Sequence, residues 1–133
     1  MKRAIVEDAM FPACPVRNIL ARLCDKWTLL VLYLLDRSET GKLRFTEDRK
    51  ALPDISQKML ATTLRTLEED GYITRTLFAQ IPPRVEYALT QRSETLRPIL
   101  EELLVWAMEN MEAVMQDRRA ARRLKNEKKR IKE

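Results

Sequence analysis

The stretch that decides the fold reads Leu52-Pro53-Asp54-Ile55-Ser56-Gln57-Lys58-Met59-Leu60, and a helical pattern follows it as far as Gly71. Proline disfavours the α region at the residue before it, and the Ser56 hydroxyl can then accept from the N–H groups of a new first helical turn. Gly71 is expected to end this helix as a left-handed cap. We predict that its buried stripe consists of three leucines at helical spacing, Leu60, Leu64 and Leu67.

The opposite face of this helix is polar. Its candidate DNA contacts are Ser56, Gln57, Lys58, Thr62 and Arg65. An α-helix fits the major groove of B-DNA, where Gln can pair with adenine, Lys or Arg with guanine or phosphate, and Thr with the thymine methyl. The positive end of the helix dipole also favours a phosphate near Ser56. A polar face opposite a leucine stripe is equally typical of any solvated helix, so the face alone leaves both interpretations open.

A β-hairpin is predicted directly after this helix. The runs 72–78 and 84–90 alternate with a period of two, which indicates half-buried strands, and residues 79–83 with two prolines form the tip. Arg75, Gln80 and Arg84 are candidate contacts to the DNA backbone or minor groove. Arg84 can equally form a structural ion pair with Glu86 on the alternate strand position.

Four elements are expected before the helix that Ser56 caps. A helix opens at Cys14-Pro15, since proline is well tolerated in a first helical turn. A second, capped by Asp25, runs from Lys26 to about Leu35; it is apolar nearly all round, so it should be central and buried. Leu43 is expected in a short strand at the edge of the hairpin, and residues 45–52 in a short helix.

A long helix is predicted from Gln91 onward. One apolar stripe is expected to pack on the same chain: Leu96, Leu100, Leu103, Ala107, Met111 and Val114. Further apolar residues lie outside that stripe, which suggests a second partner surface. The predicted organisation is therefore an N-terminal arm (residues 1–13), a DNA-binding and dimerisation domain (residues 14–115) and a basic extension (residues 116–133).

Composition argues against several functional classes. The 133 residues suit one domain, and no run approaches the roughly 18 apolar residues of a membrane span. The chain has no histidine, and its two cysteines, Cys14 and Cys24, fit no zinc pattern. We therefore expect no catalysis, no metal and no cofactor. No secretory signal is recognised, so we expect a cytoplasmic protein.

The net charge of +5 does not by itself indicate a DNA-binding body. The basic extension holds nine basic and three acidic residues, whereas residues 1–115 hold 16 basic and 17 acidic ones. The extension could add phosphate affinity or lie against an anionic partner, but we expect a solvated, frayed end.

The order of motifs resembles the HxlR family of prokaryotic transcriptional regulators, which are relatives of MarR-type winged helices. The motifs that carry the resemblance are Cys14-Pro15-Val16, Lys26-Trp27-Thr28-Leu29-Leu30, Arg44-Phe45-Thr46-Glu47, 51–60, 64–71 and 82–90. The resemblance implies a mainly α fold with a small β-hairpin, a winged helix-turn-helix whose long terminal helix forms a homodimer. It implies a recognition helix starting at Ser56, a wing around Pro82-Pro83 and a pseudo-palindromic site in double-stranded DNA.

Some members of this family sense oxidants or electrophiles through the cysteine of the Cys-Pro motif, here Cys14. A redox or small-molecule effector is therefore compatible with the resemblance, and Cys24 is interpreted as structural. We expect a sequence-specific, dimeric transcriptional regulator. The alternative is a winged-helix protein-interaction module that does not read DNA sequence.

Overall fold

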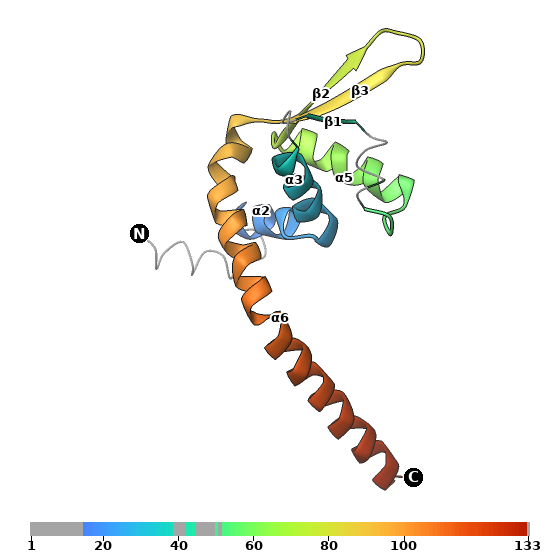
Figure 1. The fold of residues 1–133 in the computed structure, drawn as a ribbon, viewed down its shortest axis with the longest axis vertical. Helices are drawn as coiled ribbons and strands as arrows, with labels where there is room; N and C mark the ends of the chain where they lie inside the picture. Colours follow the sequence, from blue (N-terminus) through green and yellow to red (C-terminus); the bar gives the residue numbers. More distant parts are fainter. Residues whose placement is uncertain (1–14, 39–41, 45–49, 51, 133) are drawn as a thin grey trace. The chain divides into compact units, whose positions relative to one another are not determined.

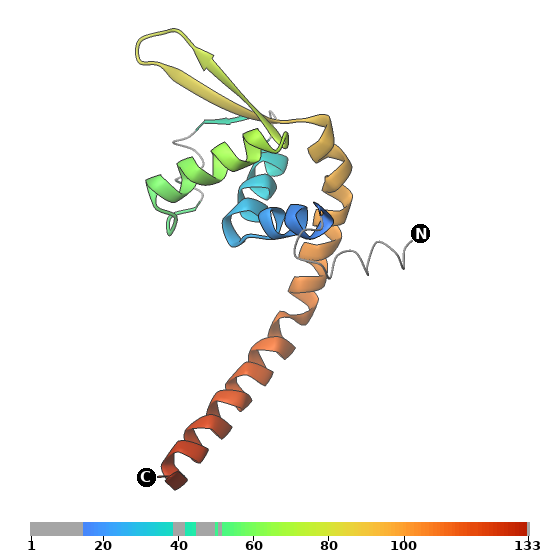
Figure 2. The same ribbon diagram turned by 180° about the vertical axis from the view of Figure 1, so that it is seen from behind.

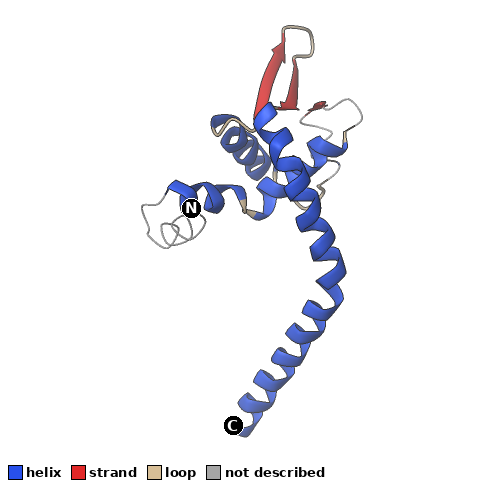
Figure 3. Ribbon diagram, turned by 90° about the vertical axis from the view of Figure 1, so that its left-hand side faces the viewer, coloured by secondary structure: helices blue, strands red, loops and turns tan. Residues whose placement is uncertain are grey.

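The computed structural model describes residues 15–38, 42–44, 50 and 52–132. The chain divides into two compact units, residues 1–97 and residues 98–133, and each is described by itself. The elements labelled in Figure 1 are α2 (Pro15–Leu23), α3 (Lys26–Arg37), β1 (Lys42–Arg44), α5 (Gln57–Glu69), β2 (Ile73–Phe78), β3 (Arg84–Leu89) and α6 (Gln91–Lys132). Helices dominate, and the strands are confined to one small sheet (Figure 3).

Helix α3 lies at the centre of the first unit, as its all-round apolar sequence predicts. The Asp25 side chain accepts from the Trp27 N–H at 3.2 Å, which confirms the predicted cap. Val31, Leu32 and Leu35 are at most 2% exposed. Removing this apolar surface from water is the main stabilising contribution of the helix.

Helix α5 packs against α3 through the predicted leucine stripe. Leu60, Leu64 and Leu67 are 0–1% exposed. The Ser56 hydroxyl accepts from the Met59 N–H at 3.0 Å, so the predicted cap is confirmed. Gly71 follows the helix with φ +77°, in the left-handed region that favours glycine.

The sheet has three antiparallel strands in the order β1-β3-β2. Leu43 pairs with Tyr87, so the predicted edge strand beside the hairpin is confirmed. Ile73 is 2% exposed and Leu77, on the same face, is 58% exposed. The hairpin therefore leaves the core partway along its length, and its tip projects away from α3 and α5 (Figures 1 and 2).

The first turns of α6 are fixed to the turn that follows α5. The Thr90 hydroxyl donates to the Gly71 carbonyl, the Ser93 hydroxyl to the Tyr72 carbonyl, and the Arg92 guanidinium to the Asp70 carbonyl. Arg97 Nε lies 2.7 Å from an Asp36 carboxylate oxygen of α3. These contacts set the position at which α6 begins in the first unit.

Helix α6 continues without interruption to Lys132. The expectation of a frayed basic extension is therefore wrong, although its solvent exposure is confirmed. Most of this segment consists of Arg, Lys, Ala, Leu and Glu, which have high helix propensity. Pro98 lies inside the helix, at the boundary between the two units.

Several predictions fall on residues that the structure does not describe. The N-terminal arm and Cys14 lie outside the described residues, as does most of the short helix expected over residues 45–52. The division at residue 115 between domain and extension stays a prediction. None of the described helices is both long and apolar enough to cross a membrane.

Candidate nucleic-acid interface

The exposed face of α5 carries the polar residues that the sequence singles out. Gln57, Lys58, Thr62 and Arg65 are all exposed, and they stand opposite the buried leucines on a helix of 13 residues. Among the residues that the structure describes, neither Lys58 nor Arg65 forms an ion pair. Their charged groups are therefore available to a ligand.

Two of the candidate hydroxyl groups already have partners within the helix. The Thr62 hydroxyl donates to the Lys58 carbonyl at 2.9 Å, which leaves its methyl group and lone pairs for other contacts. The Ser56 oxygen accepts from the Met59 N–H. Ser56 thus acts first as a helix cap, which leaves its hydroxyl hydrogen and its second lone pair for a ligand.

The acidic residues of α5 gather at the opposite end of the helix. Arg22 of α2 lies 2.7 Å from the Asp70 carboxylate and 3.8 Å from that of Glu69. The hydrogen bond with Asp70 raises the pKa of the Arg22 guanidinium. Gln57 and Lys58 therefore stand in the first turn of α5 and Arg65 in its third, while part of the acidic end of the helix is paired.

The hairpin places its two candidate arginines on opposite faces. Arg75 pairs in register with Tyr87, whereas Arg84 pairs with Phe78, and neighbouring pairs alternate between faces. Arg75 is exposed. The two arginines therefore cannot contact one surface side by side.

Arg84 is held within the hairpin. Its guanidinium lies 3.1 Å from Glu86 and 4.4 Å from the centre of the Phe78 ring. The structural ion pair is therefore confirmed, whereas a DNA contact by Arg84 stays a prediction. Its buried Nε has no hydrogen-bond partner among the described residues.

The tip of the hairpin presents an apolar residue that the sequence reasoning passed over. Ile81 is 102% exposed, beside the exposed candidate Gln80. The link between Arg22 and Asp70 was also missed, because its partners stand 48 positions apart and no local pattern relates them. Exposure of Ile81 could have been inferred from its place between the two strand runs.

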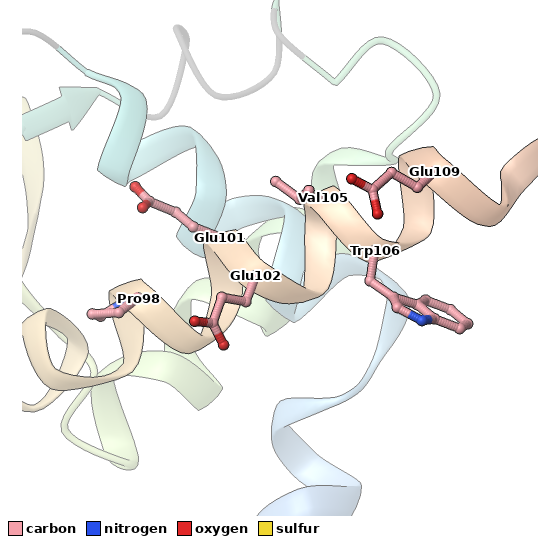
Figure 4. Close-up of a pocket in the computed structure, with 6 residues that line it drawn as sticks. All are labelled: Pro98, Glu101, Glu102, Val105, Trp106 and Glu109. Carbon is pink, nitrogen blue, oxygen red and sulfur yellow. The ribbon is translucent and has the colours of Figure 1, made fainter.

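In the second unit, α6 carries an exposed apolar surface over residues 98–115. Leu100 is buried, but the later members of its predicted stripe are not, so this surface is larger than expected. Exposed members are Ile99, Leu103, Val105, Trp106, Met108, Met111, Val114 and Met115. A shallow hollow beside them is lined by Pro98, Glu101, Glu102, Val105, Trp106 and Glu109, all on this one helix (Figure 4).

Acidic groups do not gather into a metal site in the part of the chain that the structure describes. The first unit presents an exposed polar helix face on α5 and a projecting hairpin (Figure 1). The second unit, taken by itself, presents the exposed apolar surface of α6.

Comparison with known proteins agrees with this arrangement. The family model described as HxlR-like helix-turn-helix matches residues 22–115. The HTH-type transcriptional regulator YdeP of Bacillus subtilis, itself uncharacterised, is 44% identical over 97 residues, which cover 72% of this chain and 73% of that protein.

Two solved structures are also similar. The ytfH protein of Salmonella typhimurium, described as a transcriptional regulator, has a TM-score of 0.72 at 33% identity, with 81% of this chain and 94% of that chain covered. The redox regulator HypR in its reduced form has a TM-score of 0.68 at 37% identity, with 77% of this chain and 98% of that chain covered. The α5 helix, the β2–β3 hairpin and α6 are thus the parts of a winged helix-turn-helix, and the chain belongs to the HxlR-like helix-turn-helix family of transcriptional regulators.

Proposed function

We propose that this regulator binds a specific pseudo-palindromic DNA site as a homodimer, with α5 in the major groove and the hairpin along the neighbouring backbone. The observation that carries the proposal is the exposed face of Gln57, Lys58, Thr62 and Arg65 on a helix whose other face is anchored in the core. A rigid support of this kind favours base reading, because side chains on a packed helix keep a fixed register on the duplex.

The distribution of charge on α5 supports an approach by its N-terminal end. The N–H groups of the first helical turn and Lys58 favour phosphate there, since the helix dipole is positive at that end. Glu68 and Glu69 lie at the far end of the helix, and Glu69 is within reach of Arg22. The negative groups therefore lie away from the end that would meet the DNA.

The apolar surface of α6 supports the homodimer. Trp106, Met108 and Met111 are 59–74% exposed. Large exposed apolar side chains gathered on one helix normally have a partner. In a two-fold dimer formed through α6, each protomer supplies one α5 helix, and such pairs read half-sites about one helical turn, roughly 34 Å, apart.

The recognition surface is tested by Lys58→Ala and Arg65→Ala. Each is expected to weaken binding to the specific site by about 1–3 kcal/mol, because alanine cannot donate to a base edge, and to bring specific and random affinities closer together. Genomic fragments selected by binding supply the specific duplex, and fluorescence anisotropy gives both affinities. Lys125→Ala in α6 serves as the control, and it should leave the ratio of the specific to the random affinity unchanged.

If both α5 variants kept the wild-type ratio of specific to random affinity, the exposed face of α5 would not be the recognition surface. If the wild-type chain also bound specific and random duplexes equally, the chain would be a protein-interaction module that does not read sequence.

Response to oxidants is a further part of the proposed function, supported by the similarity to HypR and by Cys14 beside Pro15. A thiol at the start of a helix reacts readily, because the helix dipole stabilises its thiolate. Diamide treatment is expected to change the DNA affinity of the wild-type protein and of Cys24→Ser, but not that of Cys14→Ser. Cys24 is a matched control, since it is a free, exposed thiol. An equal response in all three proteins would remove Cys14 as the sensor.

A further inference from the structure

Charge is segregated along α6. Residues 98–117 contain five acidic and no basic residues, whereas residues 118–132 contain nine basic residues and one acidic residue, Glu127. The HxlR-like match ends at residue 115, just before this change of sign. The basic extension therefore lies outside the part of the chain that the family membership explains.

The described residues do not neutralise the positive charges of the extension. All side chains from residue 116 to 132 are exposed, and none of the ion pairs among the described residues involves them. Like charges three or four positions apart destabilise a helix. This helix would consequently gain stability from a partner of opposite charge.

The arrangement of the charges indicates the form of that partner. At 100° per residue, the nine basic side chains occupy an arc of about 220°. Within it, Arg118, Arg122, Lys125 and Lys129 form one line at spacings of four, three and four. A flat surface contacts less than half of the circumference of a helix. The two walls of a groove can contact the basic side chains at both edges of such an arc. The major groove of B-DNA is about 12 Å wide, and a helix is about 10–12 Å across.

Two other partners fit less well. An anionic membrane would need a broad apolar face, and the extension offers only a narrow stripe of Ala120, Leu124 and Ile131. A second copy of the chain could instead offer the acidic side chains of its residues 98–117 to the extension. The basic side chains would then lie over Trp106, Met108 and Met111 of that copy. Those apolar residues would then lack an apolar partner.

We propose that the basic extension is a second DNA-binding element, which lies in a groove of duplex DNA and neutralises phosphates on both walls without reading bases. It deepens the proposed function, but it uses none of the residues of α5 or the hairpin. Sequence-independent phosphate contacts of this kind release counterions, so their number appears in the salt dependence of binding.

The test uses the full chain and random-sequence duplex DNA, with affinity measured over a range of NaCl concentrations. One variant carries Arg118→Gln, Arg122→Gln, Lys125→Gln and Lys129→Gln, because glutamine removes charge and keeps helix propensity. The matched control keeps the positive charge at the same four positions, with Arg118→Lys, Arg122→Lys, Lys125→Arg and Lys129→Arg. Circular dichroism verifies that both remain helical.

The slope of log K against log salt is expected to fall in magnitude by about 0.9 for each phosphate that the variant no longer neutralises, or up to about 3.6 in the glutamine variant. The control should keep the wild-type slope. The affinity of the glutamine variant for specific and random duplexes should fall by the same factor. This equal decrease separates the extension from α5, whose variants change the ratio of the two affinities.

An unchanged slope in a helical glutamine variant overturns the proposal. If that variant instead loses binding to phosphatidylserine vesicles, the partner is a membrane. If it changes the molecular mass in solution, the partner is a second copy of the chain.

Discussion

Replacing Leu64 with alanine is expected to lower the free energy of unfolding by about 3 kcal/mol. Leu64 is 1% exposed in the stripe that joins α5 to α3, so its removal leaves a cavity between the two helices. Alanine is the strongest helix former, and the decrease therefore comes from packing rather than from helix propensity. Urea denaturation followed by circular dichroism, at one protein concentration, measures the change.

Leu77→Ala is the matched control for that experiment. The same atoms are removed from a leucine that is 58% exposed, where the hairpin has left the core. The expected change is within about 0.5 kcal/mol, as for most surface substitutions. Equal effects of the two substitutions would mean that the leucine stripe of α5 does not hold the recognition surface in place.

The second large effect is expected from Met108→Glu together with Met111→Glu. These residues are 74% and 63% exposed on one side of α6, and burial of two carboxylates in the proposed dimer interface would be costly. The protein should become monomeric, and the specific duplex should then bind about 10²–10⁴-fold more weakly, because the second half-site is no longer held nearby. Light scattering and anisotropy measure the two effects.

Leu124→Glu together with Ile131→Glu is the control for the dimer. It places the same two charges on exposed apolar residues of the extension, and the dimer should persist. A dimeric Met108/Met111 variant would show that residues 98–115 are not the surface through which two copies associate.

Local chemistry explains which parts of the fold could be predicted from the sequence. The caps at Asp25 and Ser56 and the glycine at position 71 act within a few residues, so each is visible in a short window. The leucine stripe of α5 is equally local, because helical periodicity alone selects its members. These signals agree with one another, and the order of elements follows from them.

Contacts between distant segments could not be predicted in the same way. A period of two places Ile73 and Leu77 on one face, but it does not say where the hairpin leaves the core. The pairing of Arg22 with Asp70 depends on the packing of α2 near the end of α5. For Arg84, spacing suggested Glu86 as a partner, and only the structure adds the Phe78 ring. The exposed face of α5 could be identified from sequence, because helical periodicity places its members opposite the leucine stripe.

The joint between α5 and α6 has a consequence for the length of the DNA site. The Gly71 carbonyl accepts from Thr90, and a Cβ at Gly71 would meet the guanidinium of Arg92. The end of α5 and the start of α6 are thus held by the same few residues. In the proposed dimer, this joint lies along the chain between each α5 and the residues of α6 that would meet the partner, so it would bear on the number of base pairs between half-sites. Substitutions there would alter which spacings are accepted while leaving the preferred bases of each half-site unchanged.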